Sequence, residues 1–552
     1  MSSHAAEIRA GLAAHETNRR GLLLALLLCL PALIPLFIVL TAILSPEVAV
    51  WSHLARYVLP EVIVNTVKLV LGVAVLAGTL GTGLAWLTSM CEFPGRRFFD
   101  WALLLPLAMP AYVLAFVAVG FLDYAGPLQS WLREIFGSTR WVPAIRSTGG
   151  VIVVLSFALY PYVYLLARSA FLTQGRRAQE AARTLGLNRS AAFWRVVLPM
   201  ARPWIAAGIA LVSMETLADF GAVSVFNYDT FTTAIYRAWF GMFSVHAALE
   251  LAAILLLFVL IAFVLERKSR AGVQFGSARD MARESPRLVL NGKRAWIAFA
   301  CAASIFALAF VLPVIQLLSW SVARAASDLD ARYWGFIARS MMLATIAALL
   351  VVGTGLSLAY LHRRHPSRAM RSLVRLATMG YAVPGTVLAI GILVPVVALN
   401  NLMQDWLSTW FSESAPALLL QGTLVTVLVA YVARFLAVGF SPLESGLHRI
   451  THSLDEAAIS LGVAGAAMLR RVHMPLLRTS LTTAATLVFV DVMKEMPITL
   501  IARPFGWDTL AVRVFEMTAE GEWERAALPA IAIVLVGLIP AAMLTRRGEY
   551  VA

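Results

Sequence analysis

Two segments of this 552-residue chain share one pattern: EAARTLGLNRSAAFWRVVLP at 180–199 and EAAISLGVAGAAMLRRVHMP at 456–475. We call them the first and second EAA segments. Each opens with Glu-Ala-Ala, carries a glycine four residues after the second alanine and closes with proline. Their starts differ by 276 positions, which is half the chain length. A fixed offset of this size predicts an internal duplication into a first and a second half.

The duplication extends well beyond the EAA segments. The acidic pair Glu215 and Asp219 recurs at the same offset as Asp491 and Glu495. Earlier in each half the offset is 274, as for Gly81 with Gly355 and Pro110 with Pro384, and later it is 279, as for Asp229 with Asp508. These small shifts predict a tandem duplication with short insertions.

The composition excludes a soluble or disordered chain. Hydrophobic residues make up 60% of the sequence, charged residues only 14%, and the mean hydropathy is +0.79. Soluble domains are about half apolar and about one quarter charged. The cysteines Cys29, Cys91 and Cys301 lie too far apart for a disulfide framework or a zinc spacing. An integral membrane protein is therefore expected.

Long continuous apolar runs predict membrane-spanning helices, since a helix needs about 20 residues to cross the hydrocarbon core. We place about twelve, near 21–44, 62–89, 101–122, 149–168, 203–225, 247–265, 295–319, 336–361, 376–399, 418–440, 478–501 and 525–544. A membrane β-barrel would show short alternating segments instead. The predicted fold is an all-α polytopic membrane protein.

The basic residues predict the orientation. The net charge is +14, and most of the 45 Lys and Arg fall on one side of the predicted membrane when the N-terminus is placed inside. This excess puts both termini in the cytoplasm, and it explains the charge without nucleic-acid binding. Each half has an even number of spans, so both halves insert the same way round. That predicts a parallel repeat with a pseudo-two-fold axis along the membrane normal.

The domain boundaries follow from the same pattern. Residues 1–265 form a first unit and residues 295–552 a second unit, each with about six spans. Residues 266–294 are polar, basic and contain Gly and Ser, which predicts a cytoplasmic linker. A polybasic patch that binds lipid headgroups is the alternative.

The EAA segments predict a compact geometry on the cytoplasmic side. A glutamate near a helix start is favoured by the helix dipole, and two alanines leave a helix face with little bulk. Gly186 and Gly462 allow a helix to stop and turn. Pro199 and Pro475 suit the first turn of a following helix. A surface amphipathic loop would explain one copy, but not two copies in equivalent loops.

This spacing resembles the EAA loop of permease subunits of binding-protein-dependent ABC importers. In that family the loop is a coupling helix that docks on the ATPase subunit. The matching residues are Glu180, Ala181, Ala182, Gly186, Leu198 and Pro199 in the first half, and Glu456, Ala457, Ala458, Gly462 and Pro475 in the second. The second half departs at Met474, where the family has leucine, and Val196 and Val472 replace its isoleucine.

Segments 214–241 and 491–516 also resemble fused two-unit permeases of ferric-iron ABC importers. The resemblance implies type I permease units, ferric ion as the transported substrate, a periplasmic ferric-binding protein, two cytoplasmic ATPase subunits and a bacterial inner-membrane location. The chain has no GxxxxGK[ST] phosphate loop. ATP and Mg are therefore expected in the partner subunits, with no cofactor, catalytic residue or resident metal in this chain.

Two alternatives stay open. One is an ABC permease for another small solute, such as thiamine, a polyamine or a phosphonate. The other is a secondary transporter with twelve helices. An enzyme is disfavoured, because no nucleophile–base pair or metal-ligand spacing is apparent.

Four acidic residues fall inside predicted spans, where ionisable groups are usually functional. Glu215 and Asp219 are four residues apart and would share one helix face, as would Asp491 and Glu495. We weigh three roles for them: lining a cation path, pairing with Lys68 and Lys494 between helices, or binding iron directly, for which oxygen ligands suit a hard cation.

Overall fold

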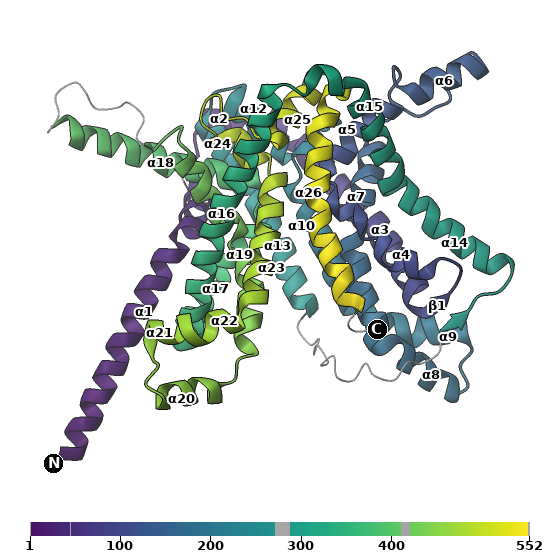
Figure 1. The fold of residues 1–552 in the computed structure, drawn as a ribbon. Helices are drawn as coiled ribbons and strands as arrows, with labels where there is room; N and C mark the ends of the chain where they lie inside the picture. Colours follow the sequence, from purple (N-terminus) through teal and green to yellow (C-terminus); the bar gives the residue numbers. More distant parts are fainter. Residues whose placement is uncertain (1, 45, 271–286, 410–419, 550–552) are drawn as a thin grey trace. The chain divides into compact units, whose positions relative to one another are not determined.

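A computed structural model describes residues 2–44, 46–270, 287–409 and 420–549. Almost all of this part of the chain is helical (Figure 1). The only strands in it are the two-residue segments β1 (Cys91–Glu92) and β2 (Leu288–Val289), which pair in parallel. The described residues contain 11 helices long and apolar enough to cross a membrane, or 12 if one bent pair is a single span. The predicted all-α polytopic class is confirmed.

The principal helices of the first half follow the predicted order. They are α1 (Ser2–Thr41), α3 (Leu59–Met90), α5 (Ala111–Leu122), α7 (Thr148–Ala170), α10 (Leu198–Ala218) and α13 (Val245–Arg270). Those of the second half are α14 (Lys293–Phe306), α15 (Leu312–Asp328), α16 (Ala331–Arg364), α18 (Gly385–Ser408), α19 (Leu424–His448), α23 (Arg478–Lys494) and α26 (Trp523–Glu549).

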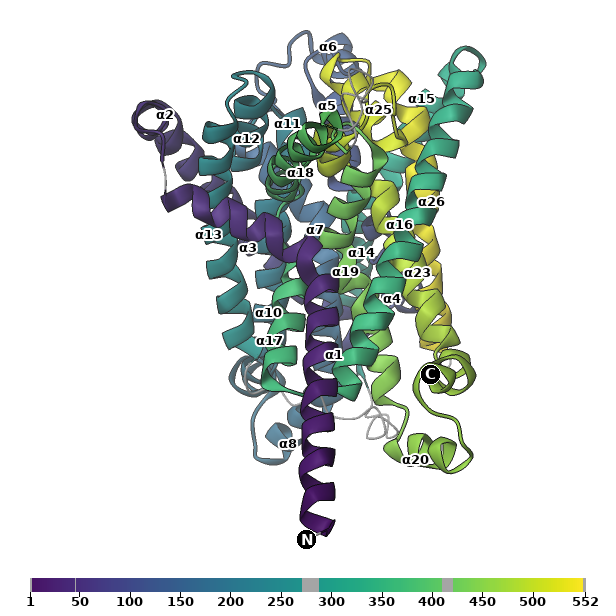
Figure 2. The ribbon, with the colours of Figure 1, turned by 90° about the vertical axis from the view of Figure 1, so that its left-hand side faces the viewer.

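The compact units of the fold are not contiguous in sequence. Unit A consists of Pro46–Tyr333 with Leu510–Ala552, and unit B of Met1–Ser45 with Trp334–Thr509. Within unit B, α1 packs against α17 (Arg368–Thr378), α18 and α19 (Figures 1 and 2). Within unit A, α15 packs against α26 and α5. Helix α1, which opens the first sequence half, thus belongs to unit B. Helices α14 and α15, which open the second half, belong to unit A.

A close helix packing recurs in both units. In unit A, a Cβ added at Gly81 of α3 would lie 2.8 Å from the Tyr160 carbonyl oxygen of α7. In unit B, a Cβ at Gly355 of α16 would lie 3.3 Å from the Phe440 backbone nitrogen of α19. Small residues let membrane helices approach closely. The repeated glycine therefore sets the distance between equivalent helix pairs.

The predicted third span at 101–122 is not a continuous helix. Helix α4 (Arg96–Ala102) is followed by a 3-10 turn at Leu105–Ala108, and α5 starts only after Pro110. The second half repeats this break, since α17 and a 3-10 turn at Met379–Ala382 precede Pro384 and α18. Proline disfavours the helical conformation of the residue before it, which explains the shared position of the break.

We predict that Gly81→Leu destabilises the protein, because the new side chain would separate α3 from α7. Overpacking of this kind costs about 1–3 kcal/mol, and the measurement is thermal unfolding in detergent. The matched control is Gly83→Leu on the same helix, where an added Cβ meets no atom within 4 Å. Equal melting temperatures for the two variants would contradict this packing.

Candidate functional site

The first EAA segment forms a short helix, a tight turn and the start of a long helix. Helix α8 (Arg176–Thr184) ends at a turn in which the Gly186 amide donates to the Arg183 carbonyl (3.0 Å) and the Leu187 amide to the Ala182 carbonyl (3.1 Å). Gly186 has φ +86°. After α9 (Arg189–Ala192) and a π-helical turn, α10 begins with Pro199 in its first turn.

The second EAA segment repeats this turn bond for bond. Helix α20 (His452–Ser460) ends where the Gly462 amide donates to the Ile459 carbonyl (2.9 Å) and the Val463 amide to the Ala458 carbonyl (2.9 Å). Gly462 has φ +78°. This pair of bonds is the Schellman motif, which needs a left-handed residue and so favours glycine. The helix and stop expected from the sequence are present in both copies.

After this turn the second segment continues through α21 (Gly465–Met468), a π-helical turn at Leu469–His473 and α22 (Met474–Leu476). Pro475 lies in the first turn of α22 and is exposed, whereas Leu198 and Pro199 are half-buried. The spanning helix α23 follows at Arg478. The helical stretch Gly465–Leu476 and α23 meet at a bend of 78°.

The two alanines of each EAA segment have different environments. Ala182 and Ala458 are buried against the protein, whereas Ala181 and Ala457 are exposed beside Glu180 and Glu456. In each copy, therefore, only one of the two alanines contributes to the exposed small-residue face that the sequence predicts.

Sequence reasoning missed a leucine in each turn. Leu185 and Leu461 are 84% and 83% exposed, although leucine is usually buried. They stand 276 positions apart, directly before Gly186 and Gly462. The shared offset was the signal that could have identified them.

The second carboxylate of each intramembrane pair lies at a helix break. Helix α10 ends at Ala218, and Asp219 is extended before α11 (Gly221–Val225). Helix α23 ends at Lys494, and Glu495 is extended before α24 (Pro497–Ala502). The expectation that each acidic pair shares one continuous helix face is therefore wrong.

The reason is that the second carboxylate of each pair caps the next helix. Asp219 Oδ1 accepts a hydrogen bond from the Val223 amide (3.0 Å), and Glu495 Oε1 accepts one from the Ile498 amide (3.1 Å). Free amides at a helix start need such acceptors. The predicted spans 203–225 and 478–501 each contain this break.

Glu495 also has an ionic partner that the sequence did not suggest. Its Oε2 lies 3.2 Å from Arg434 Nε of α19, with the two side chains 6% and 13% exposed. Arg434 in turn donates to the Val383 carbonyl (3.1 Å). Glu495 thus pairs with Arg434, a basic residue inside the apolar run 418–440, whereas Lys494 interacts electrostatically with Asp491. Lys68 lies exposed on α3.

Glu215 and Asp491, the first members of the two pairs, are half-buried in α10 and α23. Glu215 belongs to unit A and Asp491 to unit B. They lie one turn before the breaks, in the last part of each spanning helix.

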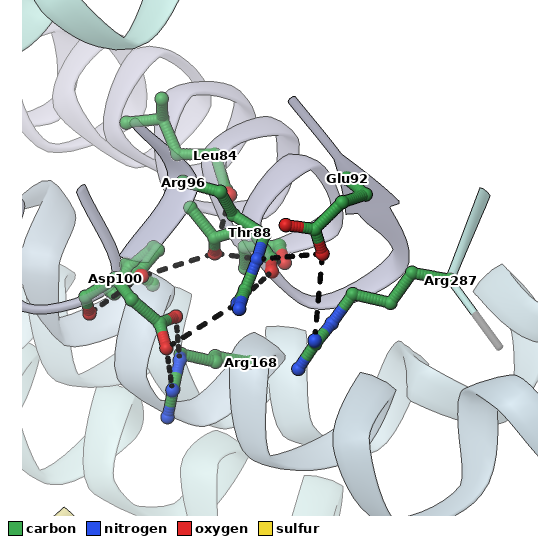
Figure 3. Close-up of polar contacts among 9 residues, drawn as sticks. Leu84, Thr88, Glu92, Arg96, Asp100, Arg168 and Arg287 are labelled. Atoms are coloured by element: carbon green, nitrogen blue, oxygen red, sulfur yellow. Dashed lines mark hydrogen bonds and ion pairs between the residues drawn. The ribbon is translucent and has the colours of Figure 1, made fainter. Parts of the chain in front are cut away.

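A charged cluster holds the end of α7, from which the chain enters the first EAA segment (Figure 3). Arg168 makes two hydrogen bonds to Asp100, at 2.9 and 2.7 Å. Arg96 Nε lies 3.0 Å from Glu92 Oε2, and Arg287 Nη1 lies 3.5 Å from the same oxygen. Since Arg287 precedes β2, the described end of the predicted linker is docked on β1 in unit A. Residues 271–286 of that linker lie outside the described part of the chain.

We predict that Glu495→Gln destabilises the protein, because it leaves Arg434 as a buried charge without its carboxylate. Breaking one partner of a buried pair costs about 3–5 kcal/mol, and thermal unfolding in detergent measures it. Asp219→Asn is the comparison, because the amide oxygen can still accept from Val223 and the loss should be small. A milder effect for Glu495→Gln than for Asp219→Asn would show that the ion pair does not hold this break.

Comparison with known proteins finds a transport family that matches part of this chain. Residues 77–269 match the family described as binding-protein-dependent transport system inner membrane component. That range contains the first EAA segment together with Glu215 and Asp219.

Three relatives illustrate the similarity. The Fe(3+)-transport system permease protein FbpB 2 of Haemophilus influenzae is 27% identical over 530 residues, which are 95% of this chain and 97% of that protein. The putative ferric transport system permease protein FbpB 1 of the same organism is 26% identical over 78% of this chain and 68% of its own length. The sulfate transport system permease protein CysT of Escherichia coli is 29% identical over 36% of this chain and 70% of its own length.

These matches confirm the resemblance drawn from the EAA segments. Residues 77–269 carry the domain of this binding-protein-dependent family, and the described residues contain 11 or 12 candidate membrane spans. The chain is similar over nearly its whole length, and so through both halves, to a ferric transport permease of nearly equal extent.

Proposed function

We propose that this chain is the membrane subunit of an ATP-driven importer in the bacterial inner membrane, with both termini in the cytoplasm, and that it carries ferric iron. The paired EAA turns are the observation that carries the ATP-driven part. Two copies of one rigid turn, each with a glutamate, an alanine and a leucine exposed, suit two copies of one docking partner. The similarity to ferric permeases over 95% of the chain supports the substrate.

The docking partners in this proposal are two cytoplasmic ATPase subunits that bind ATP and Mg. Leu185 and Leu461 would enter apolar pockets of these subunits, because burying an exposed leucine is favourable. Ala181 and Ala457 would allow close approach beside them. The chain itself does no covalent chemistry and alternates between outward and inward access.

We predict that Leu185→Asp combined with Leu461→Asp abolishes co-purification with the ATPase subunits, since a carboxylate cannot enter an apolar pocket without a large desolvation cost. The matched control is Thr184→Ala with Ser460→Ala, which alters the preceding exposed residue of each turn. Pull-down from detergent extracts measures the association. Full retention of the ATPase by the aspartate variant would refute the docking.

Ferric ion is proposed as substrate rather than as a resident metal. A periplasmic binding protein would deliver it to the outer face, and Glu215 and Asp491 would line its path as oxygen donors that suit a hard cation. Asp219 and Glu495 are candidates for the same role. Both accept hydrogen bonds from backbone amides, and Glu495 also pairs with Arg434, which supports a part in shaping the path.

We predict that Glu215→Gln combined with Asp491→Asn lowers ATP-dependent uptake of radiolabelled ferric ion by roughly tenfold, because the path loses negative charge. Proteoliposomes containing the permease, its ATPase and its binding protein give the measurement. Ser213→Ala with Thr482→Ala, on the same two helices, should leave uptake unchanged. Unaltered uptake in the carboxylate variant would remove these residues from the path.

Sulfate is the second candidate substrate, because a sulfate permease matches about a third of the chain. The same proteoliposomes separate the candidates by competition with unlabelled sulfate, thiamine, polyamine or phosphonate. Uptake that is abolished by a proton uncoupler and indifferent to ATP would instead support a secondary transporter.

A further inference from the structure

Three charged or titratable side chains meet beside the second EAA segment. Asp455 lies on α20, Arg363 lies at the end of the spanning helix α16, and His473 lies on the π-helical turn that follows α21. Arg363 donates to Asp455 Oδ2 at 2.7 Å, and His473 Nε2 lies 2.7 Å from Asp455 Oδ1. Both carboxylate oxygens are therefore engaged by side chains from two other elements. We call these three residues the α20 anchor.

The α20 anchor is largely withdrawn from water. The side chains of Arg363, Asp455 and His473 are 13%, 18% and 1% exposed. Burial opposes ionisation of Asp455, but hydrogen bonds from His473 and Arg363 outweigh it and hold the pKa of this carboxyl below its usual value. Charge-assisted hydrogen bonds in such a setting are stronger than neutral ones.

His473 is placed to donate a hydrogen bond to Asp455. Its Nδ1 is buried and has no hydrogen-bond partner. A proton on Nδ1 would be a buried donor left unsatisfied, which is costly. The tautomer that fits therefore carries its proton on Nε2 and donates it to Asp455. The ring also packs edge-on against Tyr360, with centroids 5.8 Å apart.

Arg363 extends the contacts to a third helix. Its guanidinium donates to the carbonyls of Leu447 and Ile450 at the end of α19, the latter at 2.9 Å. Tyr360, one turn earlier on α16, donates to the Gly465 carbonyl of α21 (3.1 Å). The end of α16 thus holds α19, α20 and α21 at once, all within unit B.

The first half has no counterpart of the α20 anchor at the equivalent positions. The offset of 276 pairs Asp455 with Gln179 and His473 with Val197, and the offset of 274 pairs Arg363 with Ser89. Val197 is a buried apolar residue. In the first half the ion pair Arg168–Asp100 holds α7 before the segment begins. The two segments thus share a turn but not this set of three residues.

We infer that Arg363, Asp455 and His473 are positioning residues that make α20 move as one body with α16 and the end of α19, so that the second EAA segment transmits the motion of its ATPase to these helices. This inference rests on the proposed docking of ATPase subunits. The anchor itself is a property of the permease alone, so the two can be tested separately.

The first test uses the full permease in lipid nanodiscs without ATPase. Arg363→Gln should raise amide hydrogen exchange in 452–460 by at least about tenfold, because local opening of α20 becomes easier, and should leave 176–184 unchanged. Asp455→Asn should act alike, and the double variant should add little, because both residues belong to one network. Arg364→Gln, at the exposed next position, is the control. Unchanged exchange in Arg363→Gln would overturn the anchor.

The second test measures ferric ion transported per ATP hydrolysed in proteoliposomes with ATPase and binding protein. Arg363→Gln should lower this ratio severalfold while the ATPase still co-purifies. Arg363→Lys should restore most of it, since an ammonium has three donors for the same three oxygens. A normal ratio in Arg363→Gln, with faster exchange in 452–460, would overturn the transmission role. Failure of the docking itself would appear separately, as ATPase retention by the Leu185→Asp/Leu461→Asp variant.

Discussion

A helix that breaks inside a membrane must satisfy its own freed backbone groups, because lipid offers no hydrogen bonds. This chain does so twice, at the ends of α10 and α23, and both times with a carboxylate. Asp219 and Glu495 accept from amides of the short helices that follow. The residue type needed for the break also brings negative charge to that depth, so the local solution to a backbone problem creates the polar site around which a cation path can form.

Charge brought to this depth needs compensation, and in the second half an arginine supplies it. Glu495 pairs with Arg434 at 3.2 Å, and Arg434 is tied in turn to a backbone carbonyl next to the proline break of the third span. One network therefore connects two helix interruptions in unit B. Glu215 and Asp491 lie half-buried one turn earlier on α10 and α23.

Patterns in the sequence predicted the features that depend on residues close together in the chain. The apolar runs gave the spans, and Gly186 and Gly462 marked turns that only a left-handed residue can make. The helix breaks escaped prediction because an acidic residue in an apolar run does not reveal whether it faces a neighbouring helix or caps the next one. The packing of α1 against α17, α18 and α19 could not be predicted from the sequence for another reason. A repeat shows which segments are equivalent, not which copy a helix packs against.

The same limit applies to the residues around the EAA segments. Arg363 and Asp455 are 92 positions apart, and nothing in their spacing links them. Their pairing follows only from the fold, which brings the end of α16 to α20. In a symmetric dimer of one half, any such anchor would occur twice. Fusion of the halves into one chain removes that constraint, so one EAA segment can acquire a direct anchor while the other keeps Gln179 and Val197 at the equivalent positions. The repeated turn and the unequal residues at the anchor positions are then two consequences of a single duplication.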